Sequence, residues 1–374
     1  MKLLDFLNEN ENWQNILSEP PYSLSIKNDG IYYILKYNML DSDLSIDIVQ
    51  EARGSIFRFD DEVNKWICVC HPFDKFFNYS EPNAVEIDWK NNPTIYDKLD
   101  GSLIKCWYDL GSWHISTNGV INAENAEVEG FSGTLNFLTL FKSAFGRENQ
   151  LEKCYKFLNS LNKEYTYMFE LVSPSNRLVV KYYFDKLYAL SRRNKITDFE
   201  EPFNDYELSL FFNYGIEIPK VFNFDTIEDV IESARQLTLD NEGYVVCDKN
   251  YNRVKIKGEE YLKAFKIRGN LKITKKKVVQ AILGGYIDDM IGFFGDEPKV
   301  TDTVEEFKNI KKDFESAWEC IKKLNLPTRK DYAEEIKKLG AYSSYCFFKL
   351  NNPDKTLDDF IGNMHIDKLM LLFE

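Results

Sequence analysis

Short runs of apolar residues, separated by polar turns, dominate the first two thirds of the chain. The runs are rich in Tyr, Phe, Ile and Val, and Asn, Asp, Gly and Pro stand between them. Such bounded segments are typical of β-strands joined by tight turns. We therefore predict strands at residues 30–37, 54–59, 65–70, 102–108 and 113–117.

Apolar residues at a spacing of three and four, typical of amphipathic helices, appear in other stretches. Two of them, around 123–162 and 226–237, interrupt the strand-rich part. Two more, 303–324 and 329–348, carry Lys and Glu between their apolar positions and dominate the last third of the chain. Proline residues end these helical stretches.

This change of pattern predicts an α+β protein with two domains. The first, residues 1–261, is expected to be built on antiparallel sheets with inserted helices. The second, residues 262–374, is expected to be all-helical. The length of 374 residues exceeds what one hydrophobic core usually organises, which also favours two domains.

The charge balance is acidic, with 47 Lys and Arg against 60 Asp and Glu and a net charge of −13. That balance argues against a protein that coats long nucleic acids. Residues 253–277 depart from it, because they hold ten basic residues and only two acidic ones. This stretch suits a track for RNA phosphates, although residues 272–277 are equally compatible with a solvated helix face.

The seven cysteines are scattered and odd in number, so we expect reduced thiols in a cytoplasmic protein. No apolar run approaches the length of a membrane span, and an early acid, Asp5, interrupts the apolar start that a signal peptide would need. Only three histidines are present, which makes histidine-based metal sites and Ser-His-Asp chemistry poor candidates. Oligomeric state cannot be derived from these patterns, and a monomer is the default expectation.

Candidate chemistry begins at Lys98, which is followed by Leu-Asp-Gly. A lysine amine attacks only after it loses its proton, and an Asp-Gly turn would present it at the end of a strand. Downstream, Glu170 lies within an apolar run and Glu242 opens another, while Lys255 and Lys257 share one face of a strand. Nucleotidyl transfer to an amine needs these parts: a nucleophile, carboxylates for ribose and metal, and cations for the polyphosphate.

In this order the residues resemble the covalent nucleotidyltransferase superfamily. More narrowly, the chain resembles the bacteriophage-type RNA ligase 1 family of ATP-dependent tRNA-repair ligases. The matches to that family lie at residues 32–38 (YYILKYN), 51–54 (EARG), 71–78 (HPFDKFFN), 173–177 (SPSNR) and 285–289 (GYIDD).

The resemblance implies a role for each matched residue. Lys98 would be the adenylylated nucleophile, with Asp100 and Gly101 in supporting positions beside it. Glu170 would bind the ribose of ATP. Glu242 would contact the metal or its waters.

Phosphate contacts are implied for a second group. Arg53 and Lys75 would contact the nucleotide phosphates or the RNA 5′-phosphate, and Tyr37 would help to hold ATP. Lys255 and Lys257 would grip the triphosphate, although each is also compatible with an ordinary solvated strand face.

Three further positions complete the comparison. Arg177 would support the site, and Asp288 would contact the metal ion, although an acid on a helix is more often simply solvated. Asn118 is a departure, because the family tends to have lysines before the glycine at this point. Asn118 can hydrogen-bond to phosphate or ribose but brings no charge.

The implied reaction is ATP-dependent joining of RNA 5′-phosphate and 3′-hydroxyl ends through lysyl-AMP and RNA-adenylate intermediates. Residues 1–261 would form the nucleotidyltransferase domain, and the helical domain at residues 262–374 would select the RNA substrate. Its cofactors would be ATP and Mg²⁺, with Mn²⁺ as a substitute. The implied partner is a tRNA nicked in its anticodon loop, healed beforehand by a separate kinase-phosphatase, in the cytoplasm of an infected host cell if the chain is phage-encoded. The alternatives are a DNA ligase, a capping guanylyltransferase, or a non-catalytic RNA-binding protein on the same scaffold.

Overall fold

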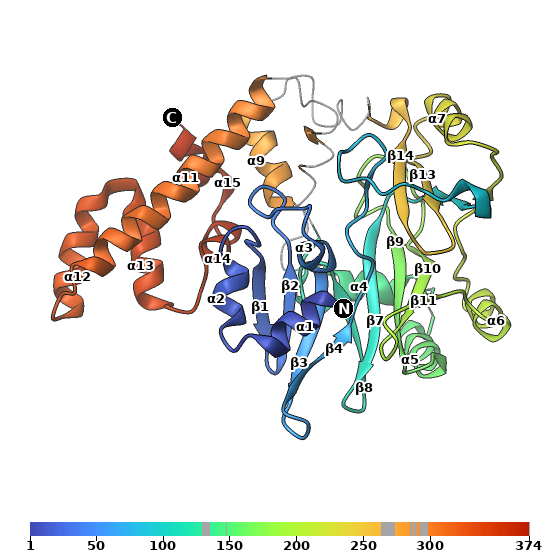
Figure 1. The fold of residues 1–374 in the computed structure, drawn as a ribbon, viewed down its shortest axis with the longest axis horizontal. Helices are drawn as coiled ribbons and strands as arrows, with labels where there is room; N and C mark the ends of the chain where they lie inside the picture. The colour runs from blue at the N-terminus through green and yellow to red at the C-terminus, as the bar shows by residue number, and fades with distance from the viewer. Residues whose placement is uncertain are drawn as a thin grey trace. The chain divides into compact units, whose positions relative to one another are not determined.

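The structure of the chain is a computed structural model. It describes residues 1–373, except for 129–134, 147, 263–273, 285–286, 288–289 and 292–297. The chain divides into two compact units, Met1–Arg268 and Gly269–Glu374. Figure 1 shows that the first unit contains the strands and that the second unit consists mainly of helices. The α+β class is therefore confirmed, while the division at residues 261 and 262 remains a prediction.

The first unit holds three sheets, with strand orders β1-β2-β3-β4, β11-β10-β9-β7-β8 and β12-β6-β13-β14-β5. All pairings between named strands are antiparallel except that of β14 with β5. The strands are β1 (Ser25–Asp29), β2 (Tyr32–Lys36), β3 (Arg53–Asp60), β4 (Lys65–Cys70), β5 (Phe77–Asn78), β6 (Thr94–Lys98), β7 (Ser102–Asp109), β8 (Ser112–Thr117), β9 (Tyr165–Val172), β10 (Lys186–Asn194), β11 (Glu200–Glu201), β12 (Val221–Phe222), β13 (Gly243–Cys247) and β14 (Arg253–Lys257).

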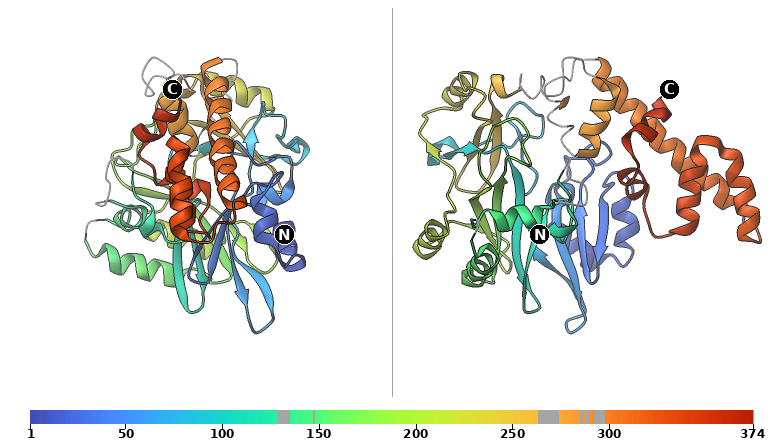
Figure 2. Two further views of the ribbon diagram at one scale, coloured as in Figure 1. Left: turned by 90° about the vertical axis from the view of Figure 1, so that its left-hand side faces the viewer. Right: turned by 180° about the vertical axis from the view of Figure 1, so that it is seen from behind.

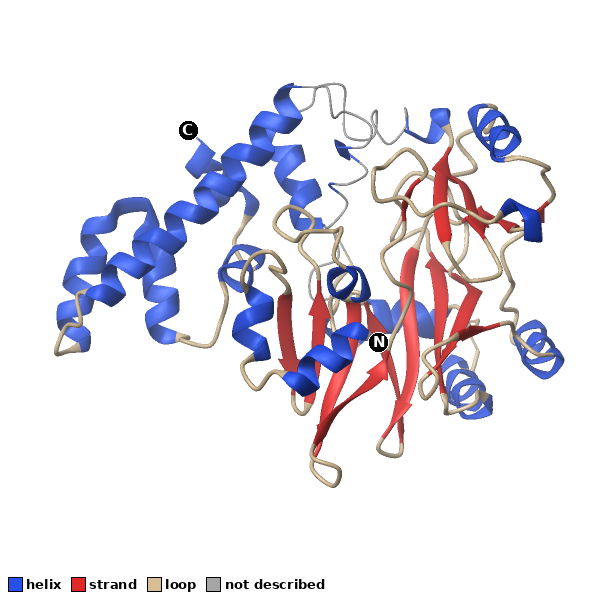
Figure 3. Cartoon of the chain, viewed as in Figure 1, coloured by secondary structure: helices blue, strands red, loops and turns tan. Residues whose placement is uncertain are grey.

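Helices cover these sheets, as the secondary-structure colours of Figure 3 make plain. The helical segments of the first unit are α1 (Lys2–Glu9), α2 (Trp13–Ser18), α3 (Asp47–Glu51), η1 (Trp89–Asn91), η2 (Ala123–Asn125), α4 (Phe137–Ser143), α5 (Gln150–Ser160), α6 (Asp205–Asn213) and α7 (Ile227–Arg235). All five strands expected from the sequence are present as β2, β3, β4, β7 and β8.

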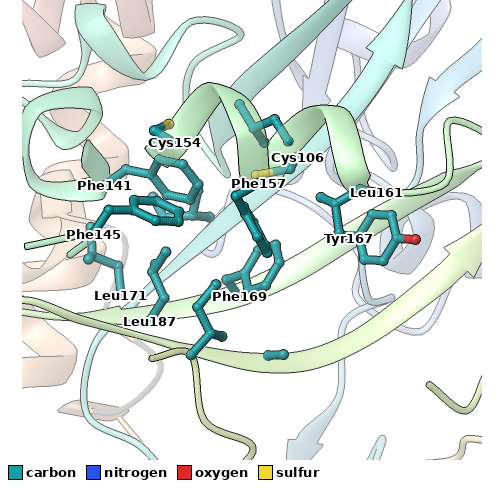
Figure 4. Close-up of a cluster of buried hydrophobic side chains, with 14 of the residues drawn as sticks. Cys106, Phe141, Phe145, Cys154, Phe157, Leu161, Tyr167, Phe169, Leu171 and Leu187 are labelled. Carbon is teal, nitrogen blue, oxygen red and sulfur yellow. The ribbon is translucent and has the colours of Figure 1, made fainter. Parts of the chain in front are cut away.

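Each sheet has its own apolar core. One core joins β9 and β10 to α4, α5 and α6, and its aromatic residues include Phe141, Phe157 and Phe169 (Figure 4). A second lies between α1, α2 and the β1–β4 sheet, and a third lies between α7 and β13 and β14. Two views of this arrangement are given in Figure 2. Burial of these apolar faces fixes the sheets that carry the candidate site residues.

The regular secondary structure of the second unit is helical throughout its described residues. Its segments are α9 (Lys275–Gly284), α11 (Pro298–Lys323), α12 (Arg329–Ile336), η3 (Lys337–Tyr342), α13 (Ser343–Asn351), α14 (Leu357–Gly362), α15 (Ile366–Met370) and η4 (Leu371–Phe373). The expected helix at 303–324 lies within α11. The single helix expected at 329–348 was wrong, because Gly340, at φ 57°, breaks it between α12 and α13.

The cysteines and the absence of a membrane span were also predicted from the sequence. All seven cysteines are free, as predicted. Across the described ranges, no helix is both long enough and apolar enough to cross a membrane.

Candidate active site

The register of three strands brings Lys98 and Lys257 to opposite sides of Gly243. Gly243 begins β13, pairs with Lys98 at the end of β6 and pairs with Lys257 at the end of β14. A Cβ atom at Gly243 would lie 2.1 Å from the carbonyl oxygen of Ile256, and the residue has a φ of 151°. Glycine is therefore required at this position. Glu242, the residue directly before Gly243, lies between the two lysines.

Glu242 forms ion pairs with both lysines. Its Oε1 lies 2.7 Å from Nζ of Lys98 and 3.0 Å from Nζ of Lys257. The Glu242 side chain is 3% exposed and that of Lys98 is 21% exposed, so the pair with Lys98 lies at the edge of the solvent. The ion pair holds the Lys98 amine beside Glu242, and an amine acts as a nucleophile only after it has lost its proton.

Asp100 anchors a long segment beside Lys98. The carboxylate accepts hydrogen bonds from the backbone amides of Val179 and Val180, both at 2.7 Å, and from the Tyr261 hydroxyl at 2.8 Å. The amide of Asp100 donates to the Tyr182 hydroxyl at 3.1 Å. Burial, with a contribution from the charge of Glu242, raises the pKa of Asp100. Its buried hydrogen bonds assign Asp100 a positioning role.

Glu170 and Gly101 belong to one close contact between β7 and β9. Leu103 pairs with Glu170 across these strands. A Cβ at Gly101 would lie 2.5 Å from the carbonyl oxygen of Leu171 and 3.0 Å from Cγ of Glu170. Burial raises the pKa of Glu170 to about 7, against the opposing effect of Lys98 and with a further increase from Glu242. The glycine after Asp100 thus lets the strand that carries Glu170 approach the Lys98 turn.

Arg53 and Asn118 meet at Gly54. A Cβ at Gly54 would lie 2.7 Å from the carbonyl oxygen of Asn118. The Arg53 guanidinium carbon lies 5.0 Å from the centre of the Phe76 ring. Among the described residues, Nη1 of Arg53 and Oδ1 of Asn118 are buried without a hydrogen-bond partner. Buried polar atoms are rarely left unpaired, so these two atoms fit a site that takes a polar ligand.

Lys75 and Tyr37 are held next to the same part of the chain. The Lys75 ammonium lies 5.7 Å from the centre of the Tyr37 ring and 5.2 Å from that of Phe77. Backbone hydrogen bonds join Tyr37 to Ala52 and Lys75 to Gln50. The structure therefore brings the three upstream segments with family resemblance together just before Arg53.

Arg177 and Lys255 do not take part in the ion pairs around Lys98 that are described above. Arg177 is exposed and donates from Nε to the carbonyl oxygen of Val179 at 3.0 Å. Lys255 is buried in β14, where it pairs with Val245 and with Asn78. It is not part of an exposed strand face.

Asp288 lies outside the described residues. In the part of the chain that the structure describes, no three His, Cys, Asp or Glu residues form a group suited to a metal ion. Glu242 is an oxygen donor of the kind that Mg²⁺ prefers, and a metal there would need its remaining ligands from phosphate and water.

Lys105 is a candidate that sequence reasoning missed. This lysine, in the middle of β7, is fully buried and donates a hydrogen bond from Nζ to the carbonyl oxygen of Gly54. Burial lowers the pKa of Lys105 to about 8, opposed by Cys70 and Cys68, with Arg53 lowering it further. The available signal was a single charged residue within the apolar run at 103–107.

The basic stretch at 253–277 is only partly open to RNA. Arg253 binds Glu200 through two hydrogen bonds of 2.8 and 2.7 Å. Lys275 pairs with Glu306, and Lys276 pairs with Asp367. Four of the ten basic residues lie outside the described residues: Lys263, Lys266, Arg268 and Lys272. The phosphate track therefore remains a prediction.

Comparison with known proteins adds an independent observation. The profile of a family described as RNA ligase matches residues 51–267. A protein of Autographa californica nuclear polyhedrosis virus, named as a bifunctional polynucleotide kinase/RNA ligase, is 30% identical over 296 residues. That alignment covers 73% of this chain but only 39% of the viral protein. An RNA ligase of Rhodothermus phage RM378 is 25% identical over 348 residues, which cover 79% of this chain and 78% of the phage protein.

Solved structures give weaker similarity. An archaeal ATP-dependent RNA ligase superposes with a TM-score of 0.44 at 12% identity, covering 90% of this chain and 76% of that one. A mutant Naegleria gruberi RNA ligase with ATP and Mn has a TM-score of 0.34 at 14% identity, covering 46% of this chain and 51% of that one.

Proposed function

This chain belongs to the RNA ligase family, and from that premise we propose that it joins RNA ends with ATP through adenylylation of Lys98. The observation that carries the proposal is the strand register that gathers Lys98, Glu242 and Lys257 around Gly243. This arrangement supplies a nucleophile, a carboxylate and a second cation within one ion-paired group.

In the first step, Nζ of Lys98 forms a bond to the α-phosphorus of ATP, and the bond to the bridging oxygen of pyrophosphate breaks. Lys98 must first separate from Glu242 and lose its proton to solvent. Lys257 is close enough to keep Glu242 paired when this happens, since both lysines contact the same oxygen. Lys257 and Lys255 then offset the charge on pyrophosphate as it leaves.

In the second step, an oxygen of the RNA 5′-phosphate attacks the same phosphorus, the P–N bond breaks, and Lys98 regains a proton. In the third step, a 3′-hydroxyl attacks the 5′-phosphorus, AMP leaves and the phosphodiester forms. The unpaired buried Nη1 of Arg53 would donate to a phosphate oxygen, and the unpaired buried Oδ1 of Asn118 would accept from a ribose hydroxyl. Glu242 would hold a Mg²⁺ ion, which would supply positive charge to neutralise the phosphates.

The natural substrate that we propose is a tRNA nicked in its anticodon loop. A relative that is named for both kinase and ligase activities supports the pairing of end healing with sealing. This chain spans about two fifths of that relative, and we propose that healing of the ends is performed by a separate kinase-phosphatase.

Labelling of the protein with α-labelled ATP and Mg²⁺ tests this function. We expect covalent label on the denatured wild-type chain, no label on Lys98→Ala, and full label on Lys156→Ala, a control at an exposed lysine of α5. Label that survives in Lys98→Ala would refute the mechanism. Preferential labelling by GTP would instead indicate a capping enzyme.

The substrate proposal has its own test. A nicked anticodon stem-loop with 5′-phosphate and 3′-hydroxyl ends should be sealed faster than a nicked DNA duplex of the same length. Faster sealing of the DNA would identify a DNA ligase, whatever the labelling result.

A further inference from the structure

The segment between β9 and β10 has one face fixed to the candidate site and another face open to solvent. The amides of Val179 and Val180 donate to Asp100, and the Tyr182 hydroxyl accepts from the Asp100 amide. At the base of the segment, the Ser173 hydroxyl donates to Asp185 at 2.6 Å. The first three of these bonds tie the segment to Asp100, which lies two residues after Lys98, and together all four limit its freedom.

Two neighbouring aromatic side chains, Tyr183 and Phe184, lie on the open face. Tyr183 is 69% exposed and Phe184 is 81% exposed. Among the described residues, neither ring packs on another aromatic ring, and the Lys181 ammonium lies 4.9 Å from the centre of the Tyr183 ring. Two adjacent aromatic rings with this exposure indicate a surface that another molecule covers.

The charge of the segment identifies the kind of molecule. Residues 174–184 contain Arg177 and Lys181, both exposed. The acidic residue that follows them, Asp185, accepts hydrogen bonds from the hydroxyls of Ser173 and Ser143. The segment is thus locally basic, although the whole chain carries a net charge of −13. Aromatic rings flanked by cations are the combination that binds single-stranded nucleic acids, because bases stack on the rings and phosphates meet the cations.

Other exposed aromatic residues lack this combination. Phe199 is 73% exposed but stands beside Asp198, Glu200 and Glu201. Phe212 is 84% exposed on α6, which contains two acidic residues and no basic one. Neither Phe199 nor Phe212 has an exposed lysine or arginine within four residues in the sequence, so these positions do not share the chemistry of Tyr183 and Phe184.

We propose that Tyr183 and Phe184 form a stacking platform for unpaired bases of the RNA end that reaches Lys98, with Lys181 and Arg177 contacting its phosphates. The proposal rests on the proposed RNA ligase function, because it takes single-stranded RNA as the occupant. Through Asp100, a base on this platform is tied to the turn that carries Lys98. The platform would thus place an RNA end and would take no part in the transfer of AMP to Lys98.

The test uses the full chain with Tyr183 and Phe184 both changed to alanine. Binding of a fluorescent single-stranded RNA, measured by anisotropy without ATP, should weaken at least tenfold, since two stacking contacts are lost. The Phe212→Ala variant is the matched control and should bind as the wild type does. A Tyr183→Trp/Phe184→Trp variant should retain binding, because it keeps both aromatic faces.

An RNA of the same length with abasic sites replacing its bases separates stacking from charge. It should bind the wild type and the double alanine variant equally weakly. Lysyl-AMP formation from ATP should be unchanged in the double alanine variant. Unchanged affinity of that variant for normal RNA, or an equal loss on abasic RNA, would overturn the platform. Failure of the wild type to form lysyl-AMP would instead refute the proposed function. The RNA-binding assay would still show whether Tyr183 and Phe184 bind unpaired bases.

Discussion

Glu170 shows how burial sets the charge of a single residue at the site. Its pKa is raised to about 7, chiefly by burial, so the folded protein binds this proton more tightly than the unfolded chain does. The stability of the fold therefore falls as pH rises from about 4.5 to 7, and the loss persists above pH 7. A neutral residue would fit this place with less cost, so the carboxyl group is better explained by the ribose contact proposed for it.

We expect Glu170→Gln to separate stability from function. At pH 8 the variant should be more stable than the wild type by on the order of 1–3 kcal/mol, while at pH 4 the difference should nearly vanish. Lysyl-AMP formation should fall at least tenfold. Chemical unfolding at the two pH values and the labelling assay measure both effects. A variant that is less stable than the wild type at pH 8 would contradict this account of Glu170.

Gly243 is a second residue with a specific physical requirement. Gly243→Ala would place a Cβ 2.1 Å from the carbonyl oxygen of Ile256 and 2.7 Å from Cα of Lys257. We expect a loss of about 2–4 kcal/mol in unfolding free energy and a large drop in lysyl-AMP formation, because β14 must move and carry Lys257 with it. Gly362→Ala, which meets no atom within 4 Å, is the control. Equal stability of the two variants would show that the strand contact is not as tight as described.

At the scale of elements, the β7–β8 hairpin brings the charged side chain of Lys105 next to Gly54 and Asn118. Lys105 of β7 and Asn118, just after β8, both reach Gly54, Lys105 by a hydrogen bond to its carbonyl oxygen and Asn118 by backbone contact. The groups that affect the charge of Lys105 are Cys68 and Cys70 of β4, Arg53 of β3 and Lys36 of β2. The buried ammonium can thus offset the missing charge of Asn118.

Moving the positive charge from position 105 to position 118 tests whether Lys105 offsets the missing charge of Asn118. Lys105→Met should lower the rate of lysyl-AMP formation or of RNA adenylylation about tenfold, and adding Asn118→Lys should recover part of it. The wild type should gain stability between pH 8 and 10 as Lys105 loses its proton, since its folded pKa of about 8 is lowered by burial, and Lys105→Met should lack this gain. No recovery in the double variant, with a normal fold by circular dichroism, would argue that Lys105 acts only in packing.

The elements also show what the sequence could predict. Strands β2, β3, β4, β7 and β8 could be predicted from the sequence. Each is a short apolar run bounded by turn residues, a pattern that needs no knowledge of distant partners. Register did not follow, since the pairing of Gly243 with Lys98 joins β13 to β6, a strand that is distant in the sequence. Helix α1 was also missed. It is short, and Glu51 accepts hydrogen bonds from the first backbone amides of this helix, Lys2 and Leu3, a contact that only the folded chain provides.

A buried ionic network likewise depends on the tertiary structure. His71 lies between Asp198, at 2.6 Å, and Asp74, at 2.9 Å. Burial opposes its charged form, but these two hydrogen bonds outweigh burial and raise the pKa of His71. Arg193 pairs with Glu200 in turn. The segment that carries Lys75 is thus fixed to β10 and β11 by contacts that no local pattern reveals.

At the scale of the whole molecule, each of the two units has a core of its own. In the first unit, separate apolar clusters support the sheets, and in the second a cluster joins α11, α12 and α13 around Ile321, Ile336 and Cys346. Lys98, Glu170, Glu242 and Lys257 all belong to the first unit. We expect a unit with its own core that holds all four of these residues to fold and react with ATP independently.

We therefore expect a chain of residues 1–268 to form lysyl-AMP at a rate within about tenfold of the full chain, while sealing of a nicked RNA falls at least a hundredfold. The loss of sealing would follow from loss of the helical unit, to which we assign RNA selection. Lys98→Ala in the shortened chain is the control for covalent label, and circular dichroism with gel filtration checks its fold. A folded 1–268 chain that takes no label would show that the second unit completes the ATP site. Restoration of label by the full chain but not by full-length Asp288→Ala would then identify Asp288 as the missing contact.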